Sequence, residues 1–179
     1  EQAARAPCRS NDDTDRPDEL RIDLDPQPGA TFAQILDVAR WVQEELDRVN
    51  VPGFPKTSGS EGLHIFIPLP KGTPYQAGML FCQIIATMVA TKHPKVATVE
   101  RTVRKRKDKT IYVDYLQNIQ GKTLACAYSA RASAFAGVST PLTWKEVHAS
   151  PAPQDFTIDT IASRLDQVGD LWTKLLAHK

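Results

Sequence analysis

The segment Leu20–Asp25 alternates strictly between apolar and charged residues, and this pattern constrains the fold more than any other feature. Its apolar positions, Leu20, Ile22 and Leu24, share one face of an extended chain, and its charged positions share the other. The alternation therefore predicts a half-buried strand, which Pro26 ends.

Longer segments with helical periodicity alternate with such strands. Apolar residues recur at helical spacing from Phe32 to about Asn50, behind Thr31 as an N-cap with Gln34 three residues on. Leu63–Pro68 alternates like the first strand. Between the helix and this strand, the sequence predicts a turn at Val51–Pro55 and a loop at Lys56–Gly62.

The second half of the chain repeats the arrangement. Tyr75–Thr91 is apolar nearly all round, which predicts a buried helix. Thr110–Leu116 and Thr123–Arg131 are expected to be strands, and Ile158–Leu175 a final helix. Strands interleaved with long helices predict an α/β or α+β domain and argue against a helical bundle or a β-sandwich.

Length and composition limit the class of protein. A chain of 179 residues is enough for one compact domain, and no apolar stretch reaches the length that spans a bilayer. Its three cysteines are widely spaced, which favours reduced thiols in a cytoplasmic protein over a disulfide framework. Residues 1–15 are polar and aperiodic, so we expect a flexible segment before a domain at 16–179.

The strongest local chemistry is the pair Asp23 and Asp25. Residues two apart on a strand point the same way, so both carboxylates project from one face. They repel each other unless a cation lies between them, and oxygen ligands at that spacing suit Mg²⁺ or Mn²⁺. A solvated strand edge is the commoner explanation of such a pair taken alone.

Asp114 strengthens the metal hypothesis. It lies within an apolar strand, where an unpaired carboxylate is costly to bury. An outward-facing side chain, or one paired with a nearby Arg or Lys, remains the alternative. Together with Asp23 and Asp25 it would form a two-metal cluster that activates a 3′-hydroxyl and steadies a phosphoryl group.

The loop Lys56–Gly62 (KTSGSEG), followed by His64, is the third candidate element. Small residues let backbone N–H groups approach a phosphate, and hydroxyl groups add donors. The loop lacks the Gly-Lys-Ser/Thr ending of a Walker A motif, and Ser58 lacks the strand–turn–helix elbow of a Ser/His hydrolase. A plain turn beside a strand histidine is the alternative.

Basic residues crowd the segment 101–109, although the net charge of the chain is only +1. A basic tract beside an acidic site suits a polyanionic substrate, and a solvated charged hairpin is the alternative. The tract supplies four candidate DNA-binding residues, namely Arg104, Lys105, Arg106 and Lys107.

Five motifs in this order resemble the polymerase domain of bacterial non-homologous end-joining DNA ligases, which belongs to the archaeo-eukaryotic primase superfamily. They are 16–26 (RPDELRIDLDP), 56–64 (KTSGSEGLH), 113–118 (VDYLQN), 128–131 (YSAR) and 138–144 (VSTPLTW). The resemblance runs from about Asp15 to the C-terminus. It implies a palm-like fold of mixed sheets with packed helices.

The resemblance also implies a function and its partners. A primase-polymerase of this kind adds ribonucleotides or deoxyribonucleotides to DNA ends or gaps, in the bacterial cytoplasm at the nucleoid. Its partners would be DNA ends, nucleoside triphosphates, and a ligase domain or an end-binding protein. The implied metal ligands for Mn²⁺ or Mg²⁺ are Asp23, Asp25 and Asp114. The implied nucleotide-binding residues are Ser58, His64, Arg131, Gln117 and Lys56.

Two departures from the family pattern limit what the resemblance implies. Relatives usually carry Lys where this chain has Glu61, which would repel a triphosphate unless Lys56 or Lys122 compensates. Relatives also have about a hundred more residues before the Asp23 strand, and we expect the pocket for the DNA 5′-phosphate to be missing here. The alternatives are thus a nucleic-acid-binding module without catalysis and a two-metal phosphodiesterase.

Overall fold

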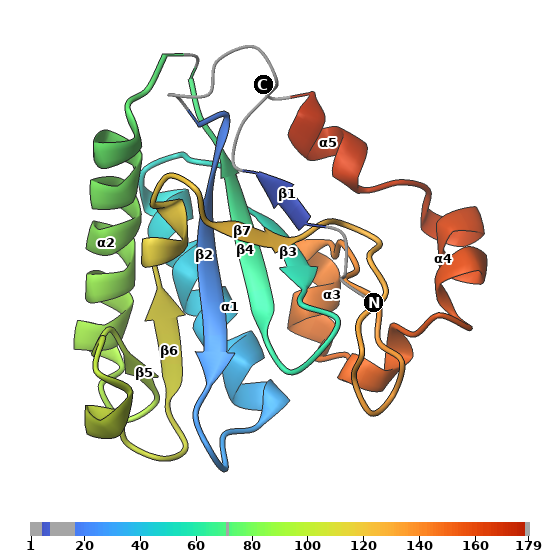
Figure 1. Cartoon of the computed structure of the whole chain (residues 1–179), viewed down its shortest axis with the longest axis horizontal. Coiled ribbons are helices and arrows are strands. Elements are labelled where there is room, and N and C mark those ends of the chain that lie inside the picture. Colours follow the sequence, from blue (N-terminus) through green and yellow to red (C-terminus); the bar gives the residue numbers. More distant parts are fainter. Residues whose placement is uncertain (1–4, 8–16, 71, 178–179) are drawn as a thin grey trace.

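The computed structural model describes residues 5–7, 17–70 and 72–177. A five-stranded sheet forms its centre (Figure 1). In spatial order its strands are β3 (Phe54–Thr57), β4 (Leu63–Pro68), β2 (Glu19–Pro26), β6 (Ile111–Asp114) and β5 (Ala97–Thr98). β2 runs antiparallel to β4 and β6, whereas β5 runs parallel to β6, so the sheet is mixed, as the resemblance implied.

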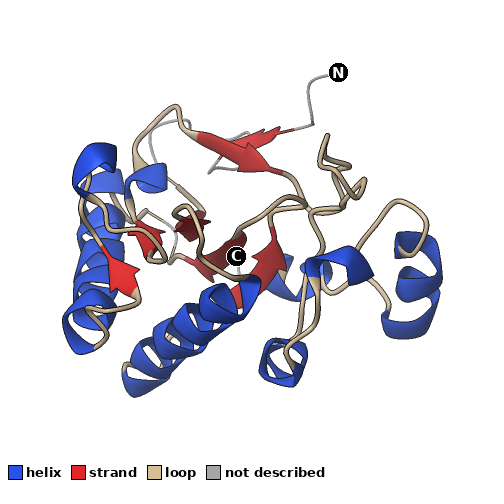
Figure 2. Ribbon diagram, turned by 90° about the horizontal axis from the view of Figure 1, so that it is seen from below, coloured by secondary structure: helices blue, strands red, loops and turns tan. Residues whose placement is uncertain are grey.

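Two long helices cover one face of this sheet. They are α1 (Phe32–Arg48) and α2 (Tyr75–Lys92), and Figure 2 shows the helical layer below the strands. Leu20, Ile22 and Leu24 of β2 are fully buried against them, so these three share one face as the alternation predicted. The expectation of a half-buried strand was wrong, because Arg21 and Asp23 on the other face are buried too. The opposite positions of β2 therefore face away from the helices.

Both helices begin and pack as their sequences dictate. Thr31 and Gln34 form the expected capping box at the start of α1. Gly78 lets α2 approach the sheet, because an added Cβ would lie 2.4 Å from the side chain of Leu20. The expectation of a buried α2 was wrong for its outer side, where Leu80 and Ile84 are exposed.

A small second sheet crosses the open face of the large one. It pairs β1 (Arg5–Pro7) with β7 (Thr123–Ala125), and Figure 2 shows it above the main strands. β7 is shorter than the expected strand 123–131 and does not join the main sheet. Of the segment expected to be flexible, Arg5–Pro7 are described as this strand, and residues 1–4 and 8–15 lie outside the described residues.

Short helices complete the chain. The 3₁₀ turns are η1 (Val103–Lys105), η2 (Leu116–Asn118) and η3 (Pro153–Asp155), and the short α-helices are α3 (Trp144–Ala149), α4 (Ile161–Val168) and α5 (Trp172–Leu176). The expected final helix is thus two helices, because Gly169 adopts φ +70° between them. Among the described residues, no helix is both long and apolar enough to cross a bilayer.

Candidate functional site

Four polar residues form a row across four strands on the face that the long helices leave open. Lys56 pairs in register with His64, His64 with Asp23, and Asp23 with Asp114. Directly opposed side chains in a sheet point to the same face and lie close together. The register therefore brings together residues that are 91 positions apart, and Asp25 lies two positions along β2 from Asp23.

The carboxylates of this row are electrostatically strained. Burial, and then the charges of Asp25 and Asp114, raise the pKa of Asp23 well above its ordinary value. Burial and Asp114 likewise raise the pKa of Asp25, and Arg106 opposes this shift. Among the described residues, Asp23 Oδ1 has no hydrogen-bond partner although it is buried. A bound cation would offset the cost of burying these charged carboxylates beside one another.

The donor set fits a hard divalent ion that brings other ligands with it. Within the described residues, no group of three or more His, Cys, Asp and Glu side chains is arranged to hold a metal ion by itself. Mg²⁺ and Mn²⁺ do not need such a cage, since one or two carboxylates with waters and substrate phosphates suffice. Asp23 and Asp25 are suitably placed for that role.

Asp114 is held in a fixed orientation by its neighbours. Its Oδ1 accepts a hydrogen bond from the backbone N–H of Leu116 at 2.7 Å and one from the Tyr112 hydroxyl at 3.3 Å. Its Oδ2 accepts from the amide of Gln117 at 3.3 Å. Gln117, expected to contact the nucleotide, thus contacts a candidate metal ligand. All three of these contacts come from residues close to Asp114 in the chain, and its side chain is half-buried.

The loop between β3 and β4 is closed by Ser58. Its Oγ accepts hydrogen bonds from the backbone N–H groups of Ser60 at 3.1 Å and Gly62 at 3.0 Å. The hydroxyl proton of Ser58 remains available to a ligand. Glu61 at the tip of the loop is exposed.

Arg131 reaches this loop from the other side of the site. Its Nη1 donates to the carbonyl oxygen of Ser58 at 3.4 Å. Gly59 makes this approach possible, since its φ is +78° and an added Cβ would lie 2.5 Å from Arg131 Cγ. The structure thus brings the predicted residues Ser58 and Arg131 together.

Asp23, Asp25, Ser58, His64 and Arg131 line one pocket of about 490 Å³. Glu61 and Arg106 also contribute to its wall. The pocket therefore combines carboxylates, a guanidinium, a hydroxyl and an imidazole, the groups that bind a metal–triphosphate complex.

Lys56 does not line this pocket. It is fully buried, and its Nζ lies 3.0 Å from His64 Nδ1. Burial lowers the pKa of Lys56 to about 7. Burial, and then the positive charges of Lys56, Arg21 and Arg131, hold the pKa of His64 well below its ordinary value. The imidazole is therefore neutral, and its 3.4 Å contact with Asp23 is not an ion pair.

The basic segment lies beside the carboxylates. Lys105, Arg106 and Lys107 line a groove of about 1290 Å³ that runs along the C-terminal part of α2 to Asp114. Arg104 is exposed but does not contribute to this groove. The structure therefore places three of the four predicted DNA-binding residues in one groove with a candidate metal ligand.

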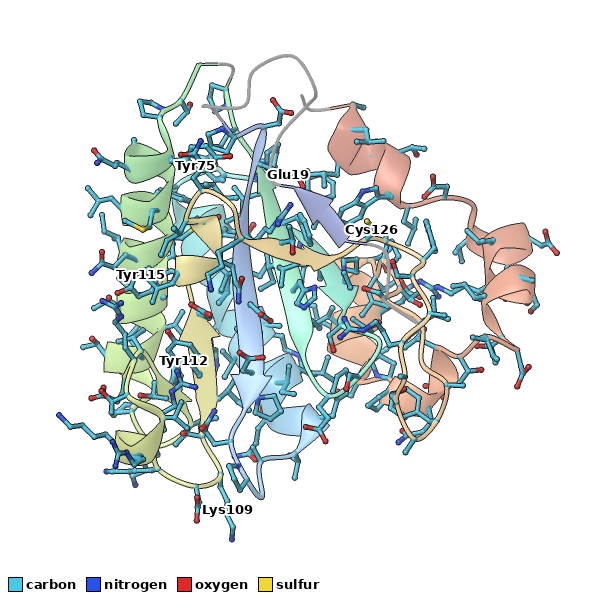
Figure 3. All side chains as sticks on the ribbon, in the orientation of Figure 1. Glu19, Tyr75, Lys109, Tyr112, Tyr115 and Cys126 are labelled. Atoms are coloured by element: carbon cyan, nitrogen blue, oxygen red, sulfur yellow. The ribbon has the colours of Figure 1, made fainter. Side chains whose placement is uncertain are left out.

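Sequence reasoning missed the way in which Arg106 joins the two cavities. Its guanidinium carbon lies 3.5 Å from the ring centroid of Tyr112, which Figure 3 labels, and its Nε donates to the carbonyl oxygen of Glu100 at 2.8 Å. Tyr112 pairs in register with Asp25. A basic residue in a run of basic residues carries no sequence signal for such a stacked position.

Comparisons with known proteins show which family the chain is similar to. A sequence model of the family described as "LigD, primase-polymerase domain" matches residues 3–172. The chain is 38% identical over 155 residues to the bifunctional non-homologous end joining protein LigD of Bacillus subtilis, covering 86% of this chain and 25% of that protein. A Mycobacterium tuberculosis LigD is 33% identical over 156 residues, covering 87% of this chain and 20% of that protein.

A solved structure gives the same result for the fold. The polymerase domain from Mycobacterium tuberculosis Ligase D in complex with DNA superposes with a TM-score of 0.81 at 31% identity. The match covers 90% of this chain and 55% of that one. The chain therefore spans about half of that domain structure and a quarter or less of the two full-length relatives.

Proposed function

Because the chain belongs to the LigD primase-polymerase domain family, we propose that it adds nucleotides to DNA ends or gaps during end-joining repair. The observation that carries this proposal is the register of β2 with β6, which places Asp23 opposite Asp114 beside a pocket lined with phosphate-binding groups. The pocket supplies a place for the triphosphate, and the groove at Asp114 a place for the DNA strand.

Asp23, Asp25 and Asp114 would hold one or two Mn²⁺ or Mg²⁺ ions together with the phosphates of the nucleotide. These ions would lower the pKa of the attacking 3′-hydroxyl and neutralise charge on the transferred phosphoryl group. The backbone N–H of Leu116 fixes the direction of the Asp114 carboxylate and so the position of any ion that it binds.

The remaining pocket residues would hold the triphosphate. Arg131 supplies positive charge, and the Ser58 hydroxyl supplies a neutral donor. His64, being neutral, can donate a hydrogen bond without competing with a metal ion for the carboxylates. Such contacts would orient the triphosphate for in-line attack, which is the main task of the protein in phosphoryl transfer.

The basic groove supports DNA as the second substrate. The solved relative was obtained in complex with DNA, and Lys105 and Lys107 are exposed where they can pair with backbone phosphates. A ligase domain or an end-binding protein as partner, and action at the bacterial nucleoid, stay predictions.

Primer extension tests the proposal. The purified chain, incubated with Mn²⁺, nucleoside triphosphates and a labelled primer in a gap or overhang, should lengthen the primer. Asp23→Ala and Asp114→Ala should abolish the extension, whereas Asp47→Ala on the exposed surface of α1 should not. Primer extension at the wild-type level by either active-site variant would contradict the proposed mechanism. A shortened primer would indicate a phosphodiesterase instead.

Glu61 favours a second candidate, a nucleic-acid-binding module without catalysis. Its carboxylate lies on the wall of the pocket, where it repels a triphosphate. Salt-sensitive DNA binding without metal-dependent nucleotide binding would support this candidate, and tight metal-dependent nucleotide binding would contradict it.

A further inference from the structure

Lys56 lies behind His64 and does not reach the triphosphate pocket itself. We propose that Lys56 is a positioning residue, which holds His64 with Nδ1 as a hydrogen-bond acceptor and with the Nε2 proton directed toward Asp23 and the triphosphate. The proposal rests on the proposed function, since it concerns how that same site holds its nucleotide.

Four acceptors surround Lys56 Nζ, and the carbonyl oxygen of Thr57, at 3.4 Å, is the farthest of them. The three nearer acceptors match the three donors of the amine. A charged amine carries three N–H donors and no acceptor. One donor is directed to the carbonyl oxygen of Ala125 at 3.1 Å. A second is directed to Ser139 Oγ, which must accept, because its own proton is donated to the carbonyl oxygen of Thr57 at 2.9 Å. The third is directed to His64 Nδ1 at 3.0 Å.

This arrangement decides the tautomer of His64. A neutral imidazole has one donor and one acceptor nitrogen. Since Nδ1 accepts from Lys56, the ring proton is on Nε2, which lies 3.4 Å from Asp23 Oδ1. Asp23 Oδ1 is buried and has no hydrogen-bond partner among the described residues. The Nε2–H group of the ring is therefore directed toward the Asp23 carboxylate and the pocket proposed for the triphosphate.

The same contacts hold His64 against the rest of the pocket. Lys56 joins β3 to β7 through Ala125 and to the segment after Arg131 through Ser139. The second segment also pairs with β3 directly, since Thr57 N donates to the carbonyl oxygen of Thr140 at 2.9 Å. Lys56 thus fixes the imidazole relative to both walls of the pocket, as buried groups do for the ligands that they support.

Nitrogen-15 NMR of the histidine rings tests the tautomer without metal or nucleotide. Spectra are recorded below the pKa of about 7 that burial gives Lys56, so that its amine is charged. The His64 signals, assigned by their loss in His64→Gln, should show a proton on Nε2 and a bare Nδ1. A wild-type ring with its proton on Nδ1 overturns the proposal, whatever any variant does.

Two variants separate positioning from general support of the fold. Lys56→Met keeps the length of the side chain but removes the donor, and His64 should then show a mixture of tautomers. Ser139→Ala removes another partner of Lys56 but leaves His64 Nδ1 untouched, and the Nε2 proton should persist. An unchanged tautomer in a folded Lys56→Met protein would also overturn the proposal.

A double-mutant cycle on nucleotide binding completes the test. Lys56→Met alone should weaken binding of the metal–nucleotide complex about tenfold, the usual effect of one hydrogen bond to a charged group. In the His64→Gln background the same change should have little further effect, because Lys56 acts through the imidazole. If the two substitutions instead reduced nucleotide affinity by factors that multiply, Lys56 would not act through His64. Failure of the wild type to bind nucleotide would refute the proposed function, and the ring spectra would still decide the tautomer.

Discussion

Asp23 on β2 lies directly opposite Asp114 on β6, so two carboxylates face each other across neighbouring strands. Like charges at directly opposed positions of a sheet are destabilising. Burial and the charges of Asp25 and Asp114 accordingly raise the pKa of Asp23. The arrangement that suits a metal–triphosphate complex therefore lowers the stability of the metal-free chain.

Replacing Asp23 by Asn should separate stability from function. The metal-free variant should gain roughly 1 kcal/mol in free energy of unfolding, because a buried like charge is removed. Nucleotide addition should fall roughly a thousandfold with the loss of a metal ligand. Urea denaturation and primer extension measure the two effects, and Asp47→Asn on exposed α1 is the matched control. An Asp23→Asn protein less stable than the wild type would show that the charge of Asp23 does not destabilise the metal-free fold.

Asp23 and Asp25 should make metal-free stability depend on pH. Their folded-state pKa values are raised, so their stabilising contribution is complete below the ordinary carboxyl value and is lost as the pH rises through the raised values. The stability advantage of Asp23→Asn should therefore grow from about pH 4 upward. Apparent Mn²⁺ affinity should rise over the same interval, since the ion displaces protons. Denaturation series and metal titrations at several pH values check both trends, and a pH-independent advantage would contradict the assignment.

Asn118 should matter for the stability of the fold although it lies outside the pocket. Its buried side chain accepts from Arg21 N at 2.8 Å and donates to the carbonyl oxygen of Arg21 at 2.7 Å. Asn118→Ala leaves these buried backbone groups without their partner, at a cost of about 2 to 4 kcal/mol. Chemical denaturation measures the loss, with exposed Gln76→Ala as the control. A loss no larger than that of the control would show that the backbone of η2 holds itself in place.

The basic segment should divide into two kinds of residue in DNA-binding titrations. Lys105→Ala and Lys107→Ala should each reduce the slope of log affinity against log salt by about 1, as the loss of one phosphate contact does. Arg106→Ala should also move metal binding to higher pH, because Arg106 opposes the raised pKa of Asp25. Unchanged salt slopes in all three variants would show that DNA does not follow this groove.

Periodicity alone could predict the parts of the fold that local sequence determines. The strand at Leu20–Asp25 and the capping box at Thr31 follow from residue order. β3 could not be predicted, because Phe54–Thr57 contains a proline and becomes a strand through pairing with β4 and with Thr140. The exposed side of α2 was missed because an apolar residue carries no sign of which neighbours will cover it.

The site divides in the same way. Asp23 and Asp25 were predictable because a spacing of two fixes their common face in any strand. The contacts of Lys56 were not, since Ala125 and Ser139 lie far along the chain and only tertiary packing brings them to its amine. A sequence shows that a lysine is present, but its burial decides whether it binds substrate or supports another residue.

Glu61 offers a gain-of-function test of the pocket. Its exposed carboxylate lines the same cavity as Arg131 and Ser58, at the position where the family resemblance led us to expect Lys. Glu61→Lys replaces a repulsive charge with an attractive one. Affinity for the metal–triphosphate complex should therefore rise roughly tenfold at low salt, and less at high salt because of screening.

Calorimetric titration measures this change, with Glu61→Gln expected to lie between the wild type and Glu61→Lys. Glu44→Lys makes the same charge change on exposed α1, behind the sheet, and controls for the net charge of the chain. An equal gain in affinity from Glu44→Lys would show that the effect of Glu61→Lys comes only from long-range electrostatic attraction. No gain from Glu61→Lys would mean that the triphosphate does not lie against the Ser58 loop, and Arg131 would lose its proposed role with it.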